Sequence, residues 1–320
     1  MERITASEKV IPMQLRGGMT VNELVNEMRG SGSFGAGRLA HAVEIYEKMI
    51  RNGATIFFGL AGAMVPAGMK KIVIDLMKKK MIDVLVSTGA NMVHDALEGL
   101  GGSHTKGSAH ADDAELHQKS IDRIYDIFVS EETFVLKFDK PILDIYRDIA
   151  SRNEGKTISI KELMWEIGER IPNRDSILHT AYELKLPIYV PAIQDSCYGL
   201  SMWEYLFKLG EEQIIVDTFA DMRDLFQTYD KANQRGAFIV GGGVPKNYIF
   251  QVAFKHGHPY DYVIQITMDR PEPGGLSGAT LEEAISWGKI GEQTNRVQVI
   301  SDATICLPLI VAAILERLNR

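Results

Sequence analysis

The sequence has few cysteines, no long hydrophobic run and no excess of positive charge. Only Cys197 and Cys306 occur among its 320 residues, which excludes a disulfide scaffold and a CxxC zinc ribbon, and we interpret both as buried free thiols. The most apolar run, Ile305 to Leu315, is too short to span a membrane and contains Pro308. Asp and Glu number 42 against 35 Lys and Arg, so we expect no nucleic-acid partner.

The N-terminal segment is polar, and we expect it to form an arm. Charged residues occur from Glu2 onward without an apolar signal segment, which favours a cytoplasmic protein. Thr20 and Glu23 have the spacing of a helix capping box, and the sequence GSGSFGAG at residues 30–37 is typical of a flexible joint. We therefore predict an N-terminal arm over residues 1–37 and one continuous domain over residues 38–320.

Helical and strand patterns alternate along the rest of the chain. Short runs that are mainly apolar on both faces are separated by segments of helical periodicity. This order predicts an α/β fold in which a mainly parallel sheet carries helices on both faces. Strands are expected at 54–60, 82–86, 186–192, 213–216, 236–240, 261–266 and 297–300, and helices at 38–51, 64–80, 113–127, 140–150, 160–170 and 174–184.

Glycine-rich turns follow several of these strands, where parallel sheets bind ligands. The residues Gly241 to Gly243 follow one strand and open a helix, so they could bind an anion such as a pyrophosphate, or simply form a tight turn. A second small-residue turn contains Thr88 and Gly89. Asp195 and Asp302 also follow strands and could accept hydrogen bonds from ribose hydroxyls, although Asp302 could equally cap a helix. Together these turns suggest an extended ligand such as a dinucleotide.

Four histidines lie within a span of 24 residues, at positions 94, 104, 110 and 117. Their spacing fits neither HxxxH nor HExxH. We interpret them as ordinary polar positions and predict no metal site.

The segment from Thr280 to Ile290 has the clearest chemical pattern. Thr280 and Glu283 form a capping box for a short helix, and Trp287 and Lys289 follow at its end. Lys289 could complement the helix dipole. It could instead be an amine nucleophile beside an aromatic wall, since a lysine must lose its proton to attack and desolvation favours that loss.

This segment also carries a family resemblance. The sequence Ser286-Trp287-Gly288-Lys289, preceded by Glu283-Ala284, resembles the active-site lysine segment of deoxyhypusine synthases. Further blocks spread over residues 38–318 are similar to the same family: Thr88 after VLV, IDRI at 121–124, Pro191-Ala192 with Asp195, Gly241 to Val244 with Lys246, and Ser301-Asp302-Ala303 with Leu307-Pro308-Leu309.

The resemblance implies a Rossmann-like NAD-binding catalytic domain, assembled as a homotetramer with active sites at subunit interfaces. It implies that Lys289 forms an imine with the aminobutyl part of spermidine and that a lysine of a translation initiation factor accepts this group. By position, NAD would be held by Thr88, Gly89, Asp195, Gly242, Gly243, Asp302 and Ala303, and the amine by Glu283, Trp287, Asn247 and His94.

Some positions depart from the family pattern. Val93 and His94 stand where the family has two glutamates, and Leu200 followed by Ser201 stands where an aspartate holds one amine. Asn247 replaces a histidine, residues 274–277 (GGLS) replace an acidic loop, and Gly62-Ala63 replaces a serine–asparagine pair. These departures leave two alternatives open: transfer to a free amine, as in homospermidine synthesis, or from another amine; and a non-catalytic NAD-binding protein.

Overall fold

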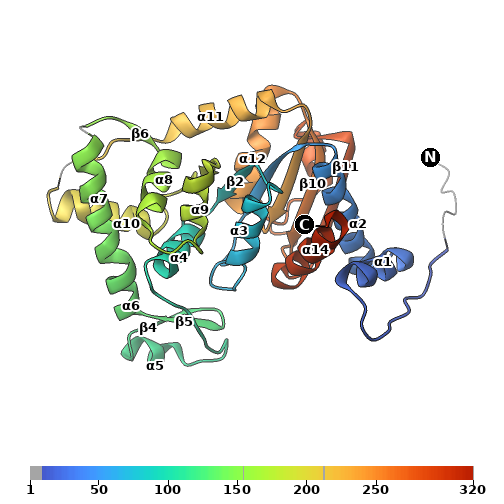
Figure 1. The fold of residues 1–320 in the computed structure, drawn as a ribbon, viewed down its shortest axis with the longest axis horizontal. Coiled ribbons are helices and arrows are strands. Elements are labelled where there is room, and N and C mark those ends of the chain that lie inside the picture. Colours follow the sequence, from blue (N-terminus) through green and yellow to red (C-terminus); the bar gives the residue numbers. More distant parts are fainter. Residues whose placement is uncertain (1–8, 154, 212, 320) are drawn as a thin grey trace.

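The computed structural model describes residues 9–153, 155–211 and 213–319, and its centre is a six-stranded sheet. All neighbouring strands in this sheet run parallel, in the order β11-β10-β9-β1-β2-β7. The predicted parallel α/β fold is therefore confirmed (Figure 1). The strands are β1 Thr55–Leu60, β2 Val84–Ser87, β7 Ile188–Tyr189, β9 Arg235–Val240, β10 Tyr260–Thr267 and β11 Ile290–Ile300.

Helices cover both faces of the sheet because its strands are apolar on both sides. In β1, Phe58 joins the core under α2 (Phe34–Arg51) and α14 (Ala303–Leu318), whereas Phe57 joins the core under α11 (Thr218–Lys231) and α12 (Gly243–His256). Both phenylalanines are fully buried. The short helix α13 (Leu281–Ser286) lies on the α12 side, with Leu281 and Ala284 in the same core.

The N-terminal helix α1 (Val21–Ser31) packs against α2 and α14 instead of standing apart. The backbone N–H groups of Val21 and Asn22 donate to the Glu316 carboxylate at 3.2 and 3.1 Å. The prediction of a flexible joint at residues 30–37 is wrong, because α1 extends to Ser31 and α2 already begins at Phe34. The division of the chain at residue 37 stays a prediction.

A small antiparallel sheet replaces much of the helix expected at 113–127. Helix α5 (Asp113–Gln118) is followed by β4 (Ile121–Ile124) and β5 (Ile127–Ser130), and β5 also pairs with β3 (Thr105–Lys106). Ser120 and Tyr125 have positive φ angles of 53° and 55°, which end the helix and form the hairpin turn. The apolar residues of this segment therefore alternate along strands, and the helical period was misread.

The segment expected to form a strand at 213–216 also lies outside the main sheet. Its last residue begins β8 (Val216–Asp217), which pairs with β6 (Ile158–Ser159) in a separate two-stranded sheet. Asp217 caps α11, so the chain turns into a helix before a longer strand can form.

A helical region extends from the β7 side of the sheet. It contains α7 (Lys140–Asn153), α8 (Ile160–Arg170), α9 (Ile177–Leu184) and α10 (Cys197–Trp203), and α8 matches its predicted bounds. The remaining helices are α3 (Lys70–Lys78), α4 (Gly89–Gly99) and α6 (Glu131–Phe134), with π-helical turns at Val135–Asp139 and Glu204–Lys208. In the described ranges, no helix is long and apolar enough to cross a membrane.

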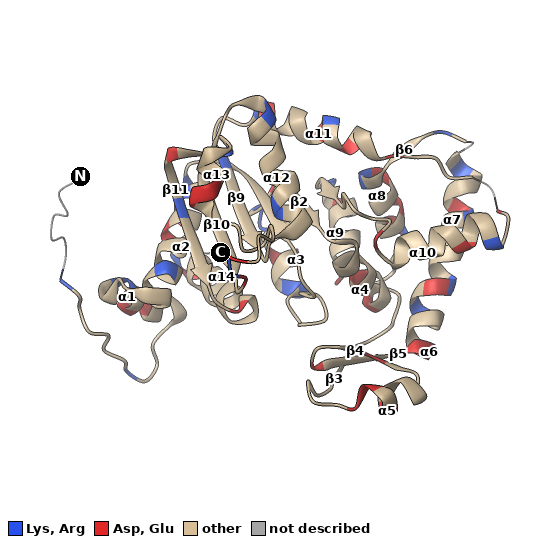
Figure 2. Ribbon diagram, turned by 180° about the vertical axis from the view of Figure 1, so that it is seen from behind, with Lys and Arg blue, Asp and Glu red and all other residues tan. Residues whose placement is uncertain are grey.

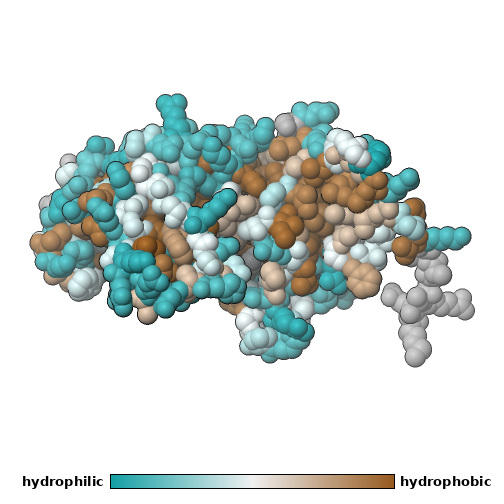
Figure 3. Space-filling model, turned by 90° about the horizontal axis from the view of Figure 1, so that it is seen from below, coloured by the Kyte–Doolittle hydropathy of each residue, from teal (hydrophilic) through white to brown (hydrophobic). Residues whose placement is uncertain are grey.

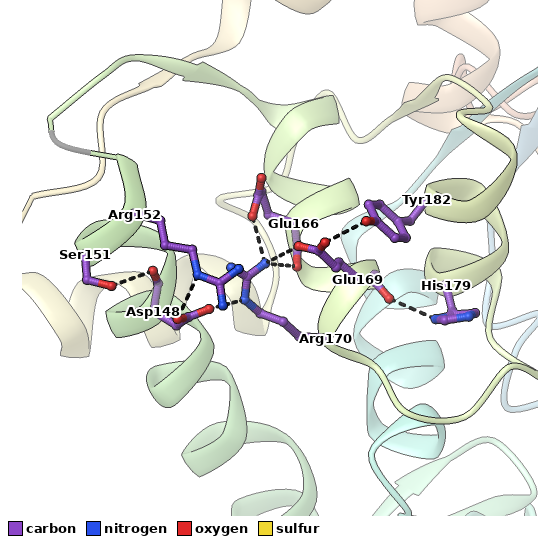
Figure 4. Close-up of polar contacts among 9 residues, drawn as sticks. Asp148, Ser151, Arg152, Glu166, Glu169, Arg170, His179 and Tyr182 are labelled. Carbon is purple, nitrogen blue, oxygen red and sulfur yellow. Dashed lines mark hydrogen bonds and ion pairs between the residues drawn. The ribbon is translucent and has the colours of Figure 1, made fainter.

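Ion pairs hold the helical region together. Arg170 of α8 donates to Asp148 of α7 at 2.6 Å and to the carboxylate of Glu166 at 2.7 Å (Figure 4). Tyr182 of α9 donates to Glu169 at 2.6 Å. Basic and acidic residues are interspersed along α7 and α11 (Figure 2), so neither helix carries charge of one sign.

Candidate active site

The residues expected to bind a cofactor gather at the carboxyl edge of the sheet. Thr88 and Gly89 follow β2, Gly242 and Gly243 follow β9, and Asp302 and Ala303 follow β11. Asp195 lies on the exposed loop after β7. The edge is linked across strands, since the Gly241 N–H donates to the carbonyl of Ile266 at 2.8 Å.

Two of these positions are helix starts. Thr88 is the N-cap of α4, and its hydroxyl accepts a hydrogen bond from the Asn91 amide at 3.3 Å. Asp302 is the N-cap of α14 and accepts from both the backbone N–H and the hydroxyl of Thr304 at 2.7 Å. Asp302 is therefore a helix cap, which was one of the two roles expected from the sequence. It also lines a small cavity of about 270 Å³, together with Thr304 and with Tyr125 of the hairpin turn.

The glycine turn requires glycine for two separate reasons. Gly241 and Gly243 have positive φ angles of 76° and 54°. A Cβ atom on Gly242 would lie 2.4 Å from the Cα of Ser277, because the loop before α13 crosses the turn there. Gly242 is the N-cap of α12 and has no side chain to cap it, so this helix N-terminus can hold an anion at the carboxyl edge.

Lys289 lies in a separate cavity of about 310 Å³ between α12 and α13. Glu283, Trp287 and Asn247 line the same cavity, so four residues expected to act on the amine come together. The Lys289 amine lies 5.5 Å from the centre of the Trp287 ring, and Phe254 packs edge-on to this ring at 5.8 Å. The cavity wall is thus aromatic next to the amine.

Local sequence explains how Lys289 is positioned. Thr280 caps α13 by accepting from the Glu283 N–H at 3.1 Å. Gly288 then adopts a φ of 65°, and the Lys289 N–H donates to the Ala284 carbonyl at 3.1 Å. This glycine turn ends the helix and directs the chain into β11.

Burial lowers the pKa of Lys289, and the nearby Glu283 carboxylate partly opposes this shift. The direction favours the neutral amine that a nucleophile needs. Lys246, on the first turn of α12, lines the same cavity and is also shifted: burial lowers its pKa to about 8. The sequence marked Lys246 only as part of the glycine block, and its burial beside Lys289 could not be read from the sequence.

His94 lies elsewhere, in a larger cavity of about 590 Å³ under α4, α10 and the hairpin. Its Nδ1 is 3.0 Å from Nε2 of His104, whose Nδ1 is 2.8 Å from Glu98. Burial and the neighbouring His104 lower the pKa of His94 to about 4, so the ring is neutral at pH 7. Within a single chain, His94 and Lys289 therefore line different cavities.

The cavity that contains His94 is acidic and apolar. Its carboxylates come from Asp122, Asp139 and Glu204, and no Lys or Arg of the described ranges lines it. Asp139 and Glu204 lie on the two π-helical turns, a helix form that is frequent at functional sites. The sequence reasoning missed both residues, because neither has a motif and only the fold brings them together.

The two thiols differ in exposure. Cys306 is buried as expected, but Cys197 is only half-buried and lines the His94 cavity. Burial raises the pKa of both thiols, so both stay protonated at neutral pH. Among the residues that the structure describes, no three His, Cys, Asp or Glu side chains are placed to hold a metal ion.

Fold and site together define a parallel α/β protein with a glycine turn at the carboxyl edge and a half-buried lysine beside an aromatic ring. The family model "Deoxyhypusine synthase" matches residues 23–314. The chain belongs to the deoxyhypusine synthase family, a family of transferases.

Curated relatives support this assignment, and a solved structure shares the fold. "Probable deoxyhypusine synthase 1" of Methanosarcina mazei is 49% identical, over 98% of this chain and 94% of the relative. The protein of the same name from Archaeoglobus fulgidus is 40% identical, over 97% of this chain and 98% of the relative. A crystal structure of a candidate deoxyhypusine synthase from Entamoeba histolytica shares the fold, with a TM-score of 0.65, 19% identity and coverage of 93% and 94%.

Proposed function

We propose that the protein catalyses NAD-dependent transfer of an aminobutyl group from spermidine, through an imine on Lys289, to a lysine of a translation initiation factor. The observation that carries this proposal is the Lys289 amine, which has a lowered pKa and faces Trp287 in a cavity of about 310 Å³. The 49% identity to a curated relative over 98% of the chain supports the same reaction.

The carboxyl edge fits a dinucleotide. The N-terminus of α12, which has no side-chain cap, offers N–H groups to a pyrophosphate, and the positive φ angles of Gly241 and Gly243 shape the turn that leads into it. We assign NAD binding to Thr88, Gly89, Asp195, Gly242, Gly243, Asp302 and Ala303. When bound, NAD would accept a hydride from the donor amine and return it at the end of the reaction.

The chain's own chemistry centres on Lys289. Its neutral amine attacks the imine carbon of oxidised spermidine, diaminopropane leaves, and the aminobutyl group stays on Nζ as an imine. The lysine of the acceptor protein then attacks this imine carbon and releases Lys289. Trp287 shields the cavity and attracts ammonium groups to its ring face, and Glu283 is the carboxylate next to the amine.

The distal ammonium of the donor needs an anionic partner, and we assign this role to the His94 cavity. Asp139 makes no ion pair with any residue in the described ranges, and burial together with Glu204 raises its pKa. Ser201, which is only 5% exposed, also lines this cavity. Apolar walls and a carboxylate without an ion pair suit an ammonium on a hydrocarbon stem.

The two cavities are separate in one chain, which favours an assembly with sites between copies. We propose a homotetramer in which the Lys289 cavity of one copy faces the His94 cavity of another. Hydrophobic side chains gather on the half of the molecule that holds α2 and α14 (Figure 3), and Ile300 and Ile305 are 47% and 60% exposed. We further propose that the enzyme acts in the cytoplasm.

A free amine is the second candidate acceptor. Glu283 is the only carboxylate that lines the Lys289 cavity in the described structure, and Asn247 is neutral. A site with a single anion suits a small amine as well as a protein lysine. Putrescine in place of the initiation factor distinguishes the two readings.

The proposed function is tested by trapping the imine. Incubation with NAD and spermidine, followed by borohydride, should add an aminobutyl group to Lys289, identified by peptide mass spectrometry. Omitting NAD is the control, because the donor is then not oxidised. Labelling of another lysine, or of none despite NAD binding, would contradict the proposal, and labelling with a different amine would name a different donor.

The role of Asp139 can be tested by removing the charge of its side chain. Asp139→Asn should raise KM for the amine about tenfold, the cost of losing one charged hydrogen bond, with little change in NAD affinity. Amine binding should also weaken as the pH falls through the raised pKa of Asp139, because only the carboxylate pairs with ammonium. Asp144→Asn is the matched control. Asp144 is an exposed residue of α7, and its carboxylate pairs with Arg147 at 2.7 Å. Equal KM values for the two variants would remove Asp139 from the site.

A further inference from the structure

A chain of three side chains ends at the cavity of about 590 Å³ that contains His94. Glu98 and His94 lie one turn apart on α4, and His104 bridges them. Its Nδ1 is 2.8 Å from the Glu98 carboxylate, and its Nε2 is 3.0 Å from Nδ1 of His94. The side chain of His104 is only 5% exposed. The proposed function assigns no role to Glu98 or His104.

A glycine turn after α4 brings His104 back onto this helix. Gly101 has a φ angle of 91°, and a Cβ atom on Gly102 would lie 2.8 Å from the carbonyl oxygen of Leu97. The chain therefore reverses tightly against the end of α4. The rings of His94 and His104 meet edge-on as a result, with their centres 4.9 Å apart.

The carboxylate of Glu98 decides which nitrogens carry protons. Burial opposes the ionisation of Glu98, but hydrogen bonds from His104 and Lys70 outweigh it and lower its pKa. An ionised carboxylate can only accept, so Nδ1 of His104 must carry a proton. In a neutral imidazole the other nitrogen is then bare. Nε2 of His104 therefore accepts from Nδ1–H of His94, which leaves Nε2 of His94 without a proton.

The bare nitrogen belongs to a ring that lines an acidic cavity. Burial, together with His104, lowers the pKa of His94 to about 4, so the ring is uncharged at pH 7 and can accept a hydrogen bond. The carboxylates of Asp122, Asp139 and Glu204 line the same cavity. An ammonium offers three donors and no acceptor, so it fits a set of acceptors. The opposite tautomer of His94 would present an N–H to the ammonium instead.

We propose that Glu98 and His104 are positioning residues that hold His94 as the Nδ1–H tautomer, so that its Nε2 accepts a hydrogen bond from the ammonium end of the donor amine. The proposal rests on the proposed function only in taking that ammonium as the occupant of the cavity. A purely structural contact would not depend on which nitrogen of His94 carries the proton, so the tautomer itself is the quantity to measure.

Solid-state NMR of the whole protein with isotope-labelled histidine reads the tautomers, since protonated and bare ring nitrogens resonate far apart. At pH 8, above the ordinary imidazole pKa of about 6.5, both rings of wild type should have a protonated Nδ1 and a bare Nε2. His94→Gln removes the His94 signals and so assigns them. A protonated Nε2 on His94 overturns the proposal. The spectra need neither NAD nor polyamine, so they test it separately from the imine on Lys289.

Spermidine added to wild type tests the contact with the amine. A bare nitrogen that accepts a hydrogen bond shifts toward the position of a protonated one, so the Nε2 signal of His94 should move in this direction as spermidine binds. The signals of the exposed His110 should stay in place. Bound spermidine that leaves the His94 Nε2 signal unmoved overturns the proposal.

His104→Phe tests the positioning role, because it keeps a ring but removes the acceptor for Nδ1–H of His94. The proton should then move to Nε2, on the side of the cavity carboxylates, and spermidine should bind about tenfold more weakly with NAD affinity unchanged. His110→Phe, the same exchange at an exposed histidine, is the matched control and should change neither property. An unchanged His94 tautomer in His104→Phe overturns the proposal. If this variant fails to fold, the wild-type tautomer and the spermidine shift decide.

Discussion

Lys289→Ala should abolish aminobutyl transfer, lowering the rate by more than about a thousandfold, while the fold and NAD binding remain as in wild type. The loss is this large because the variant has no amine to hold the transferred group, so the covalent intermediate cannot form. Lys289 is half-buried and makes no ion pair within the described ranges, so its truncation should not disturb the core. Steady-state transfer assays, NAD titration and thermal unfolding measure the three properties.

The matched control for this variant is Lys255→Ala, which removes an exposed lysine from α12 without touching the cavity. Its transfer rate should equal that of wild type. Residual transfer by Lys289→Ala above about a thousandth of the wild-type rate would rule out the imine on this residue. Transfer should also rise with pH in wild type through the lowered pKa of Lys289, because the deprotonated form reacts.

The lysine site could be predicted from the sequence because its residues are local. Thr280, Glu283, Trp287 and Lys289 lie within ten residues, and the helix cap and the turn at Gly288 place them on one cavity wall. The parallel sheet was predictable for a similar reason, since each apolar run is a continuous segment.

Contacts between distant segments could not be predicted in this way. Asp139 and Glu204 are 65 positions apart and share a cavity only because α7, α10 and the hairpin pack together. The sequence predicts a helix where the hairpin lies. The turns of the hairpin depend on positive φ angles at Ser120 and Tyr125, and serine and tyrosine are not residue types that indicate a positive φ. His94 was grouped with Lys289 from the resemblance, and a single chain keeps them in different cavities.

The glycine turn combines a local feature that the sequence indicates with a contact to a distant segment that it does not. Three consecutive glycines indicated a ligand-binding turn, but the sequence did not show that Gly242 faces another loop of the same chain. Because Gly242 has no side chain, there is room for Ser277, whose Cα would lie 2.4 Å from a Cβ atom on Gly242. The turn therefore links the cofactor edge to the loop that leads into the lysine helix, and disturbing it should affect both.

Gly242→Ala should consequently destabilise the protein by about 2 kcal/mol, the usual cost of forcing an extra methyl group into packed structure. The clash is with the Cα of Ser277, which cannot rotate away, so the loop itself must move. Because the added methyl group and the displaced loop both disturb the N-cap of α12, where the pyrophosphate is proposed to bind, NAD affinity should fall more than tenfold at a temperature where the variant is folded. Thermal unfolding and NAD titration give the two values.

Gly275→Ala is the matched control, because it adds the same methyl group to the same loop where no atom lies within 4 Å of the new Cβ. Its stability and NAD affinity should stay close to those of wild type. If Gly242→Ala were folded and bound NAD as tightly as Gly275→Ala, the α12 N-terminus would not be the pyrophosphate site. If both variants lost NAD equally, the loop and not the turn would govern binding.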